Sequence, residues 1–301
     1  MVQAYSAATS LRTRAAGLEA RAHLALLKMR IVVPLVFVAT VMAIVAGSGA
    51  VYLDKIGLLV LAGGLASAGA ACLNHYLDRD IDAVMQRTRN RPIPSGAIRN
   101  PATAALLGLG LIALAVVTAA ALNYLTVTFI ALGALFYAGV YTLWLKRRSP
   151  LNVVIGGFAG SCAVLAGWTA VDSSLSLTPV LVALIVFLWT PSHFWSLAIF
   201  LKDDYRRVGV PMLPVLIGER KTAWVIAGNT ILTVLLSLLP HHLGLFGVPY
   251  LAMAVVAGFL VLRANVRLLL NPSGSEAWRN YKLSGMYLGL VFVGMLVDST
   301  V

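Results

Sequence analysis

Three oxygen-bearing side chains, Asn74, Asp78 and Asp82, recur every four residues directly after an uncharged run from Ile56 to Leu73. An α-helix turns by about 100° per residue, so only ~80° separates the first of them from the last and all three share one face. Carboxylate and amide oxygens suit hard cations, and Mg²⁺ commonly bridges such groups to substrate phosphates. The spacing therefore predicts a metal site that binds a diphosphate.

Further charged residues surround this face. Asp80 points in another direction and is expected to be plain surface charge. The loop that follows contains cations for phosphate oxygens and prolines that favour an extended backbone: Arg87, Arg89, Arg91, Pro92 and Pro94. A solvated helix end with pairs such as Asp78 and Arg79 is the competing interpretation.

A second charged cluster, KDDYRRVGVPMLPV, begins at Lys202 and includes Asp203 and Asp204. It is expected on the same side of the membrane as the first cluster. Two acidic patches that face each other across one pocket mouth would suit a two-metal clamp on a diphosphate. Taken alone, the second patch is equally consistent with ordinary loop charge.

The chain that must position these clusters is strongly apolar. Apolar residues make up 60% of it and charged residues 11%, and the mean hydropathy is +0.89, outside the range of soluble globular proteins. Runs of about 20 residues, long enough to cross ~30 Å of hydrocarbon, predict an all-α membrane protein with about nine transmembrane helices. We place them near 31–50, 56–76, 102–122, 124–145, 151–171, 178–201, 222–240, 245–268 and 281–297. The break between the third and fourth depends on Asn123 and a short polar signal.

Basic residues alternate between the loops that these helices predict. Of the 23 lysines and arginines, only Lys55 falls in a loop on the opposite side. Short cytoplasmic loops collect basic residues, so we expect a multi-pass protein of the cell (inner) membrane with its N-terminus and active-site face cytoplasmic. The chain then divides into a basic cytoplasmic arm, 1–30, and a polytopic domain, 31–301. An organellar transit segment is the alternative interpretation of residues 1–30. The net charge of +12 reflects topology and attraction to the lipid bilayer, not nucleic-acid binding.

Four stretches carry patterns more specific than charge and hydropathy. They are Asn74 to Pro94 (NHYLDRDIDAVMQRTRNRPIP), Tyr141 to Trp168, Thr190 to Ala198 (TPSHFWSLA) and Asp204 to Val215 (DYRRVGVPMLPV). Together they resemble the intramembrane prenyltransferases of the UbiA superfamily, and more closely the protohaem IX farnesyltransferase (haem O synthase) branch. The four stretches cover roughly residues 74 to 215, and the nine-helix plan extends the likeness over nearly the whole chain.

This resemblance implies a helical bundle around a lipid-open cavity. It implies Mg²⁺-dependent transfer of the farnesyl group of farnesyl diphosphate to a vinyl group of haem B, with addition of water, giving haem O. The implied metal ligands are Asn74, Asp78, Asp82, Asp204 and, as a further candidate, Asp203. The implied diphosphate contacts are Arg87, Arg91, Lys146 and Lys202, and the implied catalytic set is Asp78, Asp82, Asp204 and Lys202. These residue types fit the implied reaction. Ionising the allylic C–O bond puts negative charge on the leaving diphosphate, and cations stabilise that charge.

The chain also departs from the family pattern at several positions. Leu201 and Tyr205 stand where many relatives carry aspartate, which weakens the case for a second metal. Ser192 replaces a proline before His193, and the residues 161–164 replace a Pro-Pro segment. These changes bear on how an acceptor would fit.

His193 lies within the sixth predicted span, where an ionisable side chain is expensive enough to be functional by default. A ligand to haem iron and a helix-to-helix hydrogen bond are both open interpretations. His75 lies about 100° away from the metal face. Five aromatic residues near the expected cavity could stabilise an allyl cation, although packing is the more ordinary role for each: Phe136, Tyr137, Tyr141, Phe194 and Trp195. Cys72 and Cys162 lie in apolar spans and are expected to be packing residues.

Two other functions compete with this prediction. A prenyltransferase with an aromatic or quinone-precursor acceptor would share the first cluster, although the HFW and PMLPV stretches argue against it. A transporter would also place charges at a pore mouth, but typically with inverted repeats and broken helices near the midplane. Docking of a haem A synthase partner and the oligomeric state are left open by the sequence.

Overall fold

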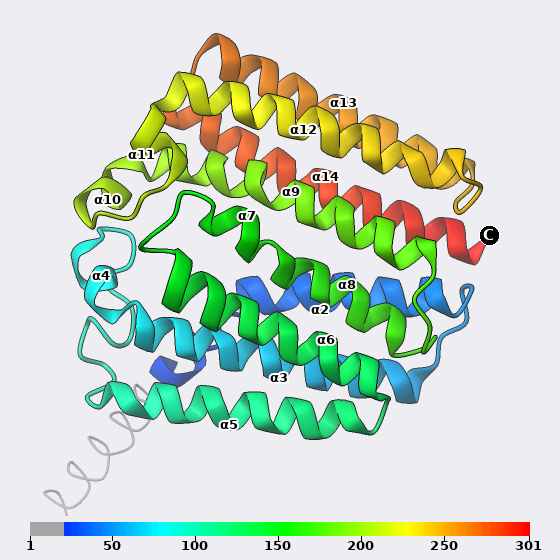
Figure 1. Cartoon of the computed structure of the whole chain (residues 1–301), viewed down its shortest axis with the longest axis horizontal. Coiled ribbons are helices and arrows are strands. Elements are labelled where there is room, and N and C mark those ends of the chain that lie inside the picture. The colour runs from blue at the N-terminus through cyan, green and yellow to red at the C-terminus, as the bar shows by residue number, and fades with distance from the viewer. Residues whose placement is uncertain (1–20) are drawn as a thin grey trace, which may run out of the picture.

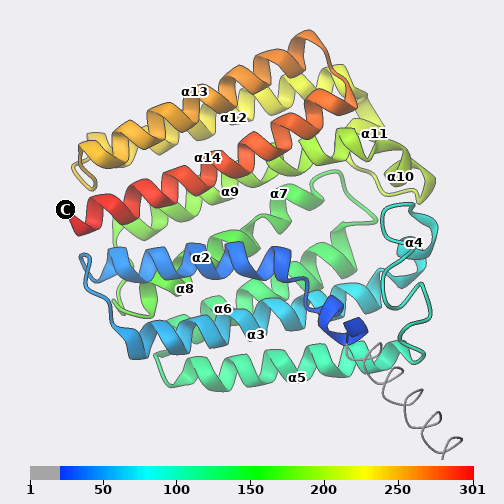
Figure 2. The same cartoon turned by 180° about the vertical axis from the view of Figure 1, so that it is seen from behind.

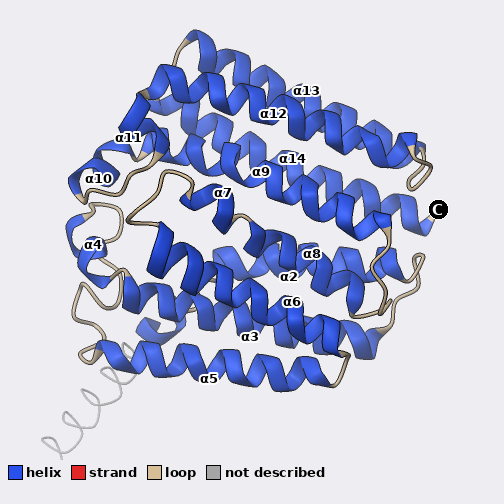
Figure 3. Ribbon diagram, in the orientation of Figure 1, coloured by secondary structure: helices blue, strands red, loops and turns tan. Residues whose placement is uncertain are grey.

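A computed structural model describes residues 21–301, and this part of the chain is helical, without a strand (Figure 3). The first twenty residues of the predicted arm lie outside the described range. Within that range, nine helices are long and apolar enough to cross a membrane, as the sequence predicts. They are α2 (Met29–Ala46), α3 (Leu53–Leu77), α5 (Pro101–Ala120), α6 with η1 (Tyr124–Leu145), α7 with α8 (Asn152–Thr169), α9 (Leu177–Phe200), α12 (Glu219–His242), α13 (Val248–Leu270) and α14 (Gly274–Thr300).

The helices lie side by side along the molecule (Figure 1). Helix α3 packs on α5, α9 on α12 and α13 on α14, while α2 packs on α3 and α8. Three short helices occupy one end of the bundle, and the C-terminus lies at the opposite end (Figures 1 and 2). They are α4 (Arg79–Val84), α10 (Lys202–Arg207) and α11 (Leu213–Ile217). Both charged clusters therefore lie at the same end of the molecule.

Two asparagines set the boundaries of neighbouring spans. Asn123 accepts a hydrogen bond from the Thr126 amide, at 2.9 Å, and so caps the first turn of α6. Asn100 caps α5 in the same way, with Pro101 as the first helical residue. The predicted break at Asn123 is confirmed and has this physical cause.

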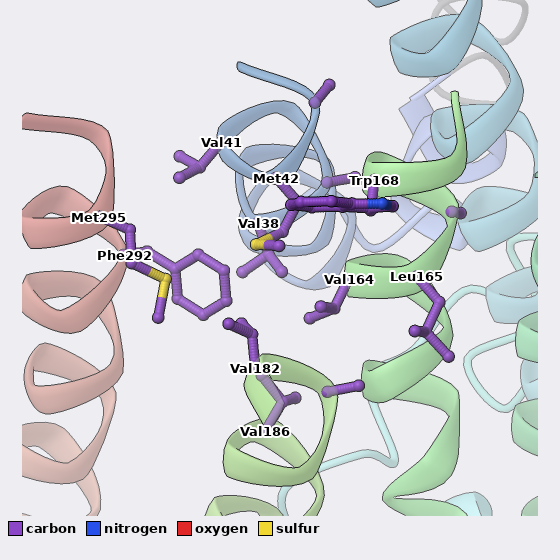
Figure 4. Packing of buried hydrophobic residues seen from close by; sticks show 14 of the residues in the cluster. Val38, Val41, Met42, Val164, Leu165, Trp168, Val182, Val186, Phe292 and Met295 are labelled. Atoms are coloured by element: carbon purple, nitrogen blue, oxygen red, sulfur yellow. The ribbon is translucent and has the colours of Figure 1, made fainter. Parts of the chain in front are cut away.

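The main core joins helices from distant parts of the sequence. Val38 and Met42 of α2 meet Trp168 of α8, and Val182 of α9 and Phe292 of α14 fill the adjoining space (Figure 4). By contrast, large apolar side chains on the outside remain exposed, such as Leu106, Leu109 and Val117 on α5. Bundles of this kind bury their exposed apolar surface in lipid, and the protein is a multi-pass membrane protein.

Close helix contact depends on glycine where α3 crosses α5. A Cβ on Gly108 would lie 2.7 Å from the carbonyl oxygen of Gly69, and a Cβ on Gly69 would lie 2.6 Å from that of Gly108. Small residues let membrane helices approach until their backbones touch. This contact fixes α3, which carries the first acidic cluster.

Two spans are irregular. The fourth widens from α6 (Tyr124–Ala134) into a π-helix, η1 (Leu135–Leu145), so that the Lys146 amide donates to the Tyr141 carbonyl at 2.8 Å. The fifth, predicted as one helix over 151–171, consists of α7 (Asn152–Gly156) and α8 (Phe158–Thr169). A Cβ at Gly156 would lie within 3.1 Å of the Tyr141 side chain, so glycine lets this bend pack against η1.

Candidate active site

The three side chains of the first cluster share one buried face, as predicted. Asn74, Asp78 and Asp82 are 4%, 0% and 1% exposed. The helical hydrogen bonds continue through them, from the Asp78 amide to the Asn74 carbonyl and from the Asp82 amide to the Asp78 carbonyl. The Asp80 side chain is instead 60% exposed and binds Arg147 through two bonds of 2.6 Å. This pair lowers the pKa of Asp80 to about 2.

Each member of this buried face contacts a cation. Asp78 binds Lys146, and Asp82 binds Arg91 with an N–O distance of 2.6 Å. Asn74 accepts a hydrogen bond from the ammonium group of Lys28. The result is a buried patch in which acidic and basic groups alternate, at the end of α3.

Hydrogen bonds among neighbours hold the orientation of Asn74. Its Nδ2 donates to Oδ2 of Asp78 at 2.7 Å and to the Thr142 hydroxyl at 3.1 Å. The other oxygen of Asp78, Oδ1, is buried and has no hydrogen-bond partner among the described residues. A buried, unpaired carboxylate oxygen is costly and marks a place where a further cation or donor would bind favourably.

The π-helix positions two of these contacts. Thr142 donates from its hydroxyl to the Tyr137 carbonyl at 2.8 Å, five residues earlier, and Lys146 follows at the end of η1. Wide turns of this type are rare and occur frequently at functional sites. Here the widening brings Thr142 to Asn74 and Lys146 to Asp78.

The second cluster meets the first through the backbone. The carboxylate of Asp204 accepts hydrogen bonds from the amides of Gln86 and Arg87, both at 3.1 Å, and from the Arg207 side chain. Asp204 is 8% exposed, so this carboxylate ties α10 to the loop after α4. The two patches are therefore adjacent.

The other two members of the second cluster face other partners. Lys202 binds Glu219 at 3.0 Å. Asp203 has an 83% exposed side chain and pairs with Arg206 one turn later at 3.1 Å. Of the three charged candidates Lys202, Asp203 and Asp204, it is Asp204 that the structure brings to the first cluster.

Tyrosines lie beside the loop 85–100 between α4 and α5, called the arginine loop below, because Tyr205 and Tyr141 share an apolar cluster with Met85. The rings of Tyr137 and Tyr141 stack with centroids 6.1 Å apart. Burial raises the pKa of the Tyr205 hydroxyl, while the charges of Arg87 and Arg91 oppose the rise. The two arginines predicted to contact diphosphate thus lie within electrostatic reach of Tyr205.

His193 lies between two aromatic rings on α9 and α14. Its ring centroid is 4.3 Å from that of Trp189 and 4.3 Å from that of Tyr281, with Phe194 edge-on at 5.6 Å. Its Nδ1 is buried and has no hydrogen-bond partner in the described part of the chain. The ring is thus held by stacking, and Nδ1 makes no helix-to-helix hydrogen bond.

The other aromatic candidates vary in position. Phe136 packs edge-on against Phe158 of α8 at 4.7 Å. Trp195 is buried and its Nε1 has no partner among residues 21–301, whereas Phe194 is 38% exposed. Cys72 and Cys162 are free and buried, as predicted.

The residues 33–291 match the model of the UbiA prenyltransferase family. The chain belongs to this family. Protoheme IX farnesyltransferase 1 of Paramagnetospirillum magneticum is 46% identical over 283 residues, which are 92% of this chain and 98% of that protein. The fold of this UbiA-family protein is also that of solved structures.

One structure, described as "Structural and mechanistic insights into the biosynthesis of Digeranylgeranylglyceryl phosphate synthase in membranes", matches 94% of this chain and 99% of its own with a TM-score of 0.77 and 21% identity. A UbiA homologue of Archaeoglobus fulgidus bound to GPP and Mg²⁺ matches 91% of this chain and 99% of its own, with a TM-score of 0.62 and 16% identity. At these identities the likeness concerns the fold.

The donor set of this family member suits a hard cation. Among the described residues, no group of three or more His, Cys, Asp or Glu side chains is close enough to hold a metal. The first cluster offers two carboxylates and one amide, from Asp78, Asp82 and Asn74, and each of these side chains carries oxygen. The unpaired Oδ1 of Asp78 is the observation that fits an additional cation here.

Sequence reasoning missed Lys28 and Thr142. Lys28 falls within the basic arm, 1–30, and its charge just before the first predicted span is the available signal. Burial lowers the pKa of the Lys28 amine well below its usual value, and Arg91 and Lys146 add to the fall. Thr142 gave no signal, since its contact with Asn74 depends on the π-helix.

Proposed function

We propose that the chain is a protohaem IX farnesyltransferase, which converts farnesyl diphosphate, haem B and water to haem O and diphosphate. The observation that carries the proposal is the 46% identity, over almost the full length of both chains, with a protein of that name. The buried patch of Asp78, Asp82, Arg91 and Lys146 supports it, because it offers both signs of charge that a metal diphosphate requires.

Mg²⁺ is proposed as the cofactor, and the UbiA homologue bound to GPP and Mg²⁺ supports this assignment. The proposed ligands are Asn74, Asp78, Asp82 and Asp204, with Asp203 as a further candidate that would have to leave Arg206. When bound, the metal would neutralise charge on the leaving diphosphate.

Protein cations supply the rest of that stabilisation. Arg87, Arg91, Lys146 and Lys202 are proposed to bind diphosphate oxygens, where charge develops as the allylic C–O bond breaks. Arg91 and Lys146 are already at the site through Asp82 and Asp78, whereas Lys202 would have to leave Glu219. The farnesyl carbon would then bond to the terminal carbon of the haem vinyl group. Water would add its hydroxyl group to the other vinyl carbon and release a proton, which the diphosphate can accept.

His193 is proposed as a ligand of haem iron. Imidazole suits iron, and a ligand nitrogen must be free of other bonds. The stacked ring with an unpaired Nδ1 meets that requirement.

The protein is proposed to lie in the cell (inner) membrane with its active-site face toward the cytoplasm. Docking of a haem A synthase stays a prediction.

The decisive experiment is to incubate purified protein with haem B, farnesyl diphosphate and Mg²⁺ and to weigh the products. The expected product is heavier than haem B by one farnesyl group and one hydroxyl group, and EDTA should prevent its formation. A parallel incubation replaces haem B with an aromatic quinone precursor. Prenylation of that acceptor alone would transfer the assignment to the competing prenyltransferase function.

A further inference from the structure

Lys28 occupies an unusual position at the start of α2. Its backbone has φ 49° and ψ 54°, in the left-handed region that residues other than glycine rarely adopt. Such conformations are strained and persist where the surrounding structure imposes them, frequently at functional sites. The strained backbone turns the lysine into the bundle, where its ammonium group reaches Oδ1 of Asn74.

The segment before Lys28 is anchored to the same end of the bundle. Leu26 is fully buried and Ala22 is 8% exposed. Both belong to an apolar cluster with Cys72 of α3, Ile93 and Ile98 of the arginine loop and Ala104 of α5. Lys28 is therefore held in place from both sides and is not a mobile surface charge.

The charges around Lys28 are unbalanced. Arg91 and Lys146 each pair with a carboxylate, Asp82 and Asp78 respectively. Lys28 bonds the neutral amide of Asn74 instead, and that amide in turn donates to Asp78. The site thus brings three basic side chains to two carboxylates, and the basic group in excess is suited to an incoming anion.

We propose that Lys28 is a diphosphate-binding residue, which exchanges Asn74 for a phosphate oxygen when the prenyl diphosphate binds. This inference rests on the proposed function and adds a residue to its site. Both hydrogens of the Asn74 amide are committed to Asp78 and Thr142, so Oδ1 is its remaining group for a metal. Lys28 occupies that oxygen until it moves to the diphosphate.

The proposal predicts that one variant loses affinity for diphosphate without losing affinity for the metal. Lys28→Met keeps most of the side-chain length and removes the ammonium group. Loss of one charge-assisted hydrogen bond should weaken the binding of inorganic diphosphate in Mg²⁺ by about tenfold or more. Binding of Mn²⁺ without diphosphate should be unchanged or tighter, because Oδ1 of Asn74 is no longer occupied.

The experiment measures both affinities and the melting temperature for wild type, Lys28→Met, Lys28→Arg and the control Arg30→Met. Lys28→Arg should keep most of the diphosphate affinity, and Arg30, which is exposed two residues later, should tolerate the change. Equal diphosphate affinity in wild type and Lys28→Met would overturn the proposal. If Lys28→Met weakened the binding of both diphosphate and Mn²⁺ and lowered the melting temperature, the proposal would also be overturned. Lys28 would then serve to stabilise the fold. Failure of the wild type itself to bind Mg²⁺-diphosphate would count against the proposed function.

Discussion

At the scale of single residues, burial separates three aspartates that are close in sequence. Asp78 and Asp82 are turned into the bundle and pair with Lys146 and Arg91, whereas Asp80 faces outward to Arg147. Burying carboxylates together with cations has a high desolvation cost, so such buried pairs indicate a functional role. An exposed pair such as Asp80 with Arg147 contributes little to stability.

This difference predicts the effects of three matched substitutions. Asp78→Asn and Asp82→Asn should each lower the rate of farnesyl transfer by at least about 100-fold, the usual cost of removing an electrostatic group from a reacting centre. Asp80→Asn should retain most of the activity. Rates with purified variants check this, and equal losses at all three positions would contradict the division into buried and exposed faces.

His193 allows a substitution that separates its ring from its nitrogens. His193→Phe keeps a ring between Trp189 and Tyr281 and removes the unpaired Nδ1. If His193 ligates iron, the absorption bands of bound haem should differ between wild type and His193→Phe, because the variant has no nitrogen to bind the iron. The variant should also bind haem about tenfold more weakly. Diphosphate affinity should not change.

The control for this experiment is His242→Ala, an exposed histidine at the far end of α12. An unaltered haem spectrum in His193→Phe would assign the residue to packing between α9 and α14.

Residue spacing predicted the shared face because helix geometry alone determines it. It did not predict the partners, because Lys28, Arg91 and Lys146 come from three other segments that only the tertiary fold brings to α3. Asp203 and Asp204 show the same limit. They are adjacent in sequence, but Asp204 is buried against the loop after α4 and Asp203 is exposed.

At the scale of elements, two departures from regular helix could not be predicted from hydropathy. An apolar run has the same composition whether its hydrogen bonds span four or five residues, so η1 was predicted as ordinary helix. The break between α7 and α8 follows from tertiary contacts of Gly156 and Gly157 with Tyr141 and Thr190. The spans themselves were predictable because length and hydropathy determine them.

Two departures from the family pattern acquire a role at this scale. The Ser161 hydroxyl donates to the Ala183 carbonyl of α9 at 2.8 Å. The Ser192 hydroxyl donates to the Ile226 carbonyl of α12 at 3.2 Å and accepts from Asn229 at 2.7 Å. Hydrogen bonds of this type connect membrane helices. Both serines therefore join helices in this protein.

The α3–α5 contact provides a stability prediction with its own control. Gly108→Ala would place a methyl group 2.7 Å from the Gly69 carbonyl, and overpacking of this kind costs about 1–3 kcal/mol. Gly110→Ala, on the same helix, meets nothing within 4 Å and should be neutral or slightly stabilising. Melting temperatures in detergent should fall for Gly108→Ala alone, and a similar fall in both would show that the contact does not determine the effect.

At the scale of the whole molecule, charge is distributed between two ends. One end contains α4, α10 and α11 with both charged clusters (Figure 1). At the other end Lys55 donates to the Val171 carbonyl, and Asp172 and Asp298 accept bonds from nearby amides. Membrane insertion retains basic loops in the cytoplasm, so this asymmetry orients the protein. We therefore expect the proposed diphosphate site to face the cytoplasm.

Cysteine labelling can determine this orientation directly. Cys72 and Cys162 are 0% and 1% exposed, so the protein without an introduced cysteine should not be labelled. Ser95→Cys introduces an exposed thiol in the arginine loop, and Ser173→Cys introduces one between α8 and α9 at the other end. In intact cells with the protein in the inner membrane, an impermeant maleimide should label Ser173→Cys alone, while lysis should make Ser95→Cys reactive as well. Labelling of Ser95→Cys in intact cells would place the acidic clusters outside, where the positive-inside rule does not allow so many arginines, and would contradict the proposed cytoplasmic active site.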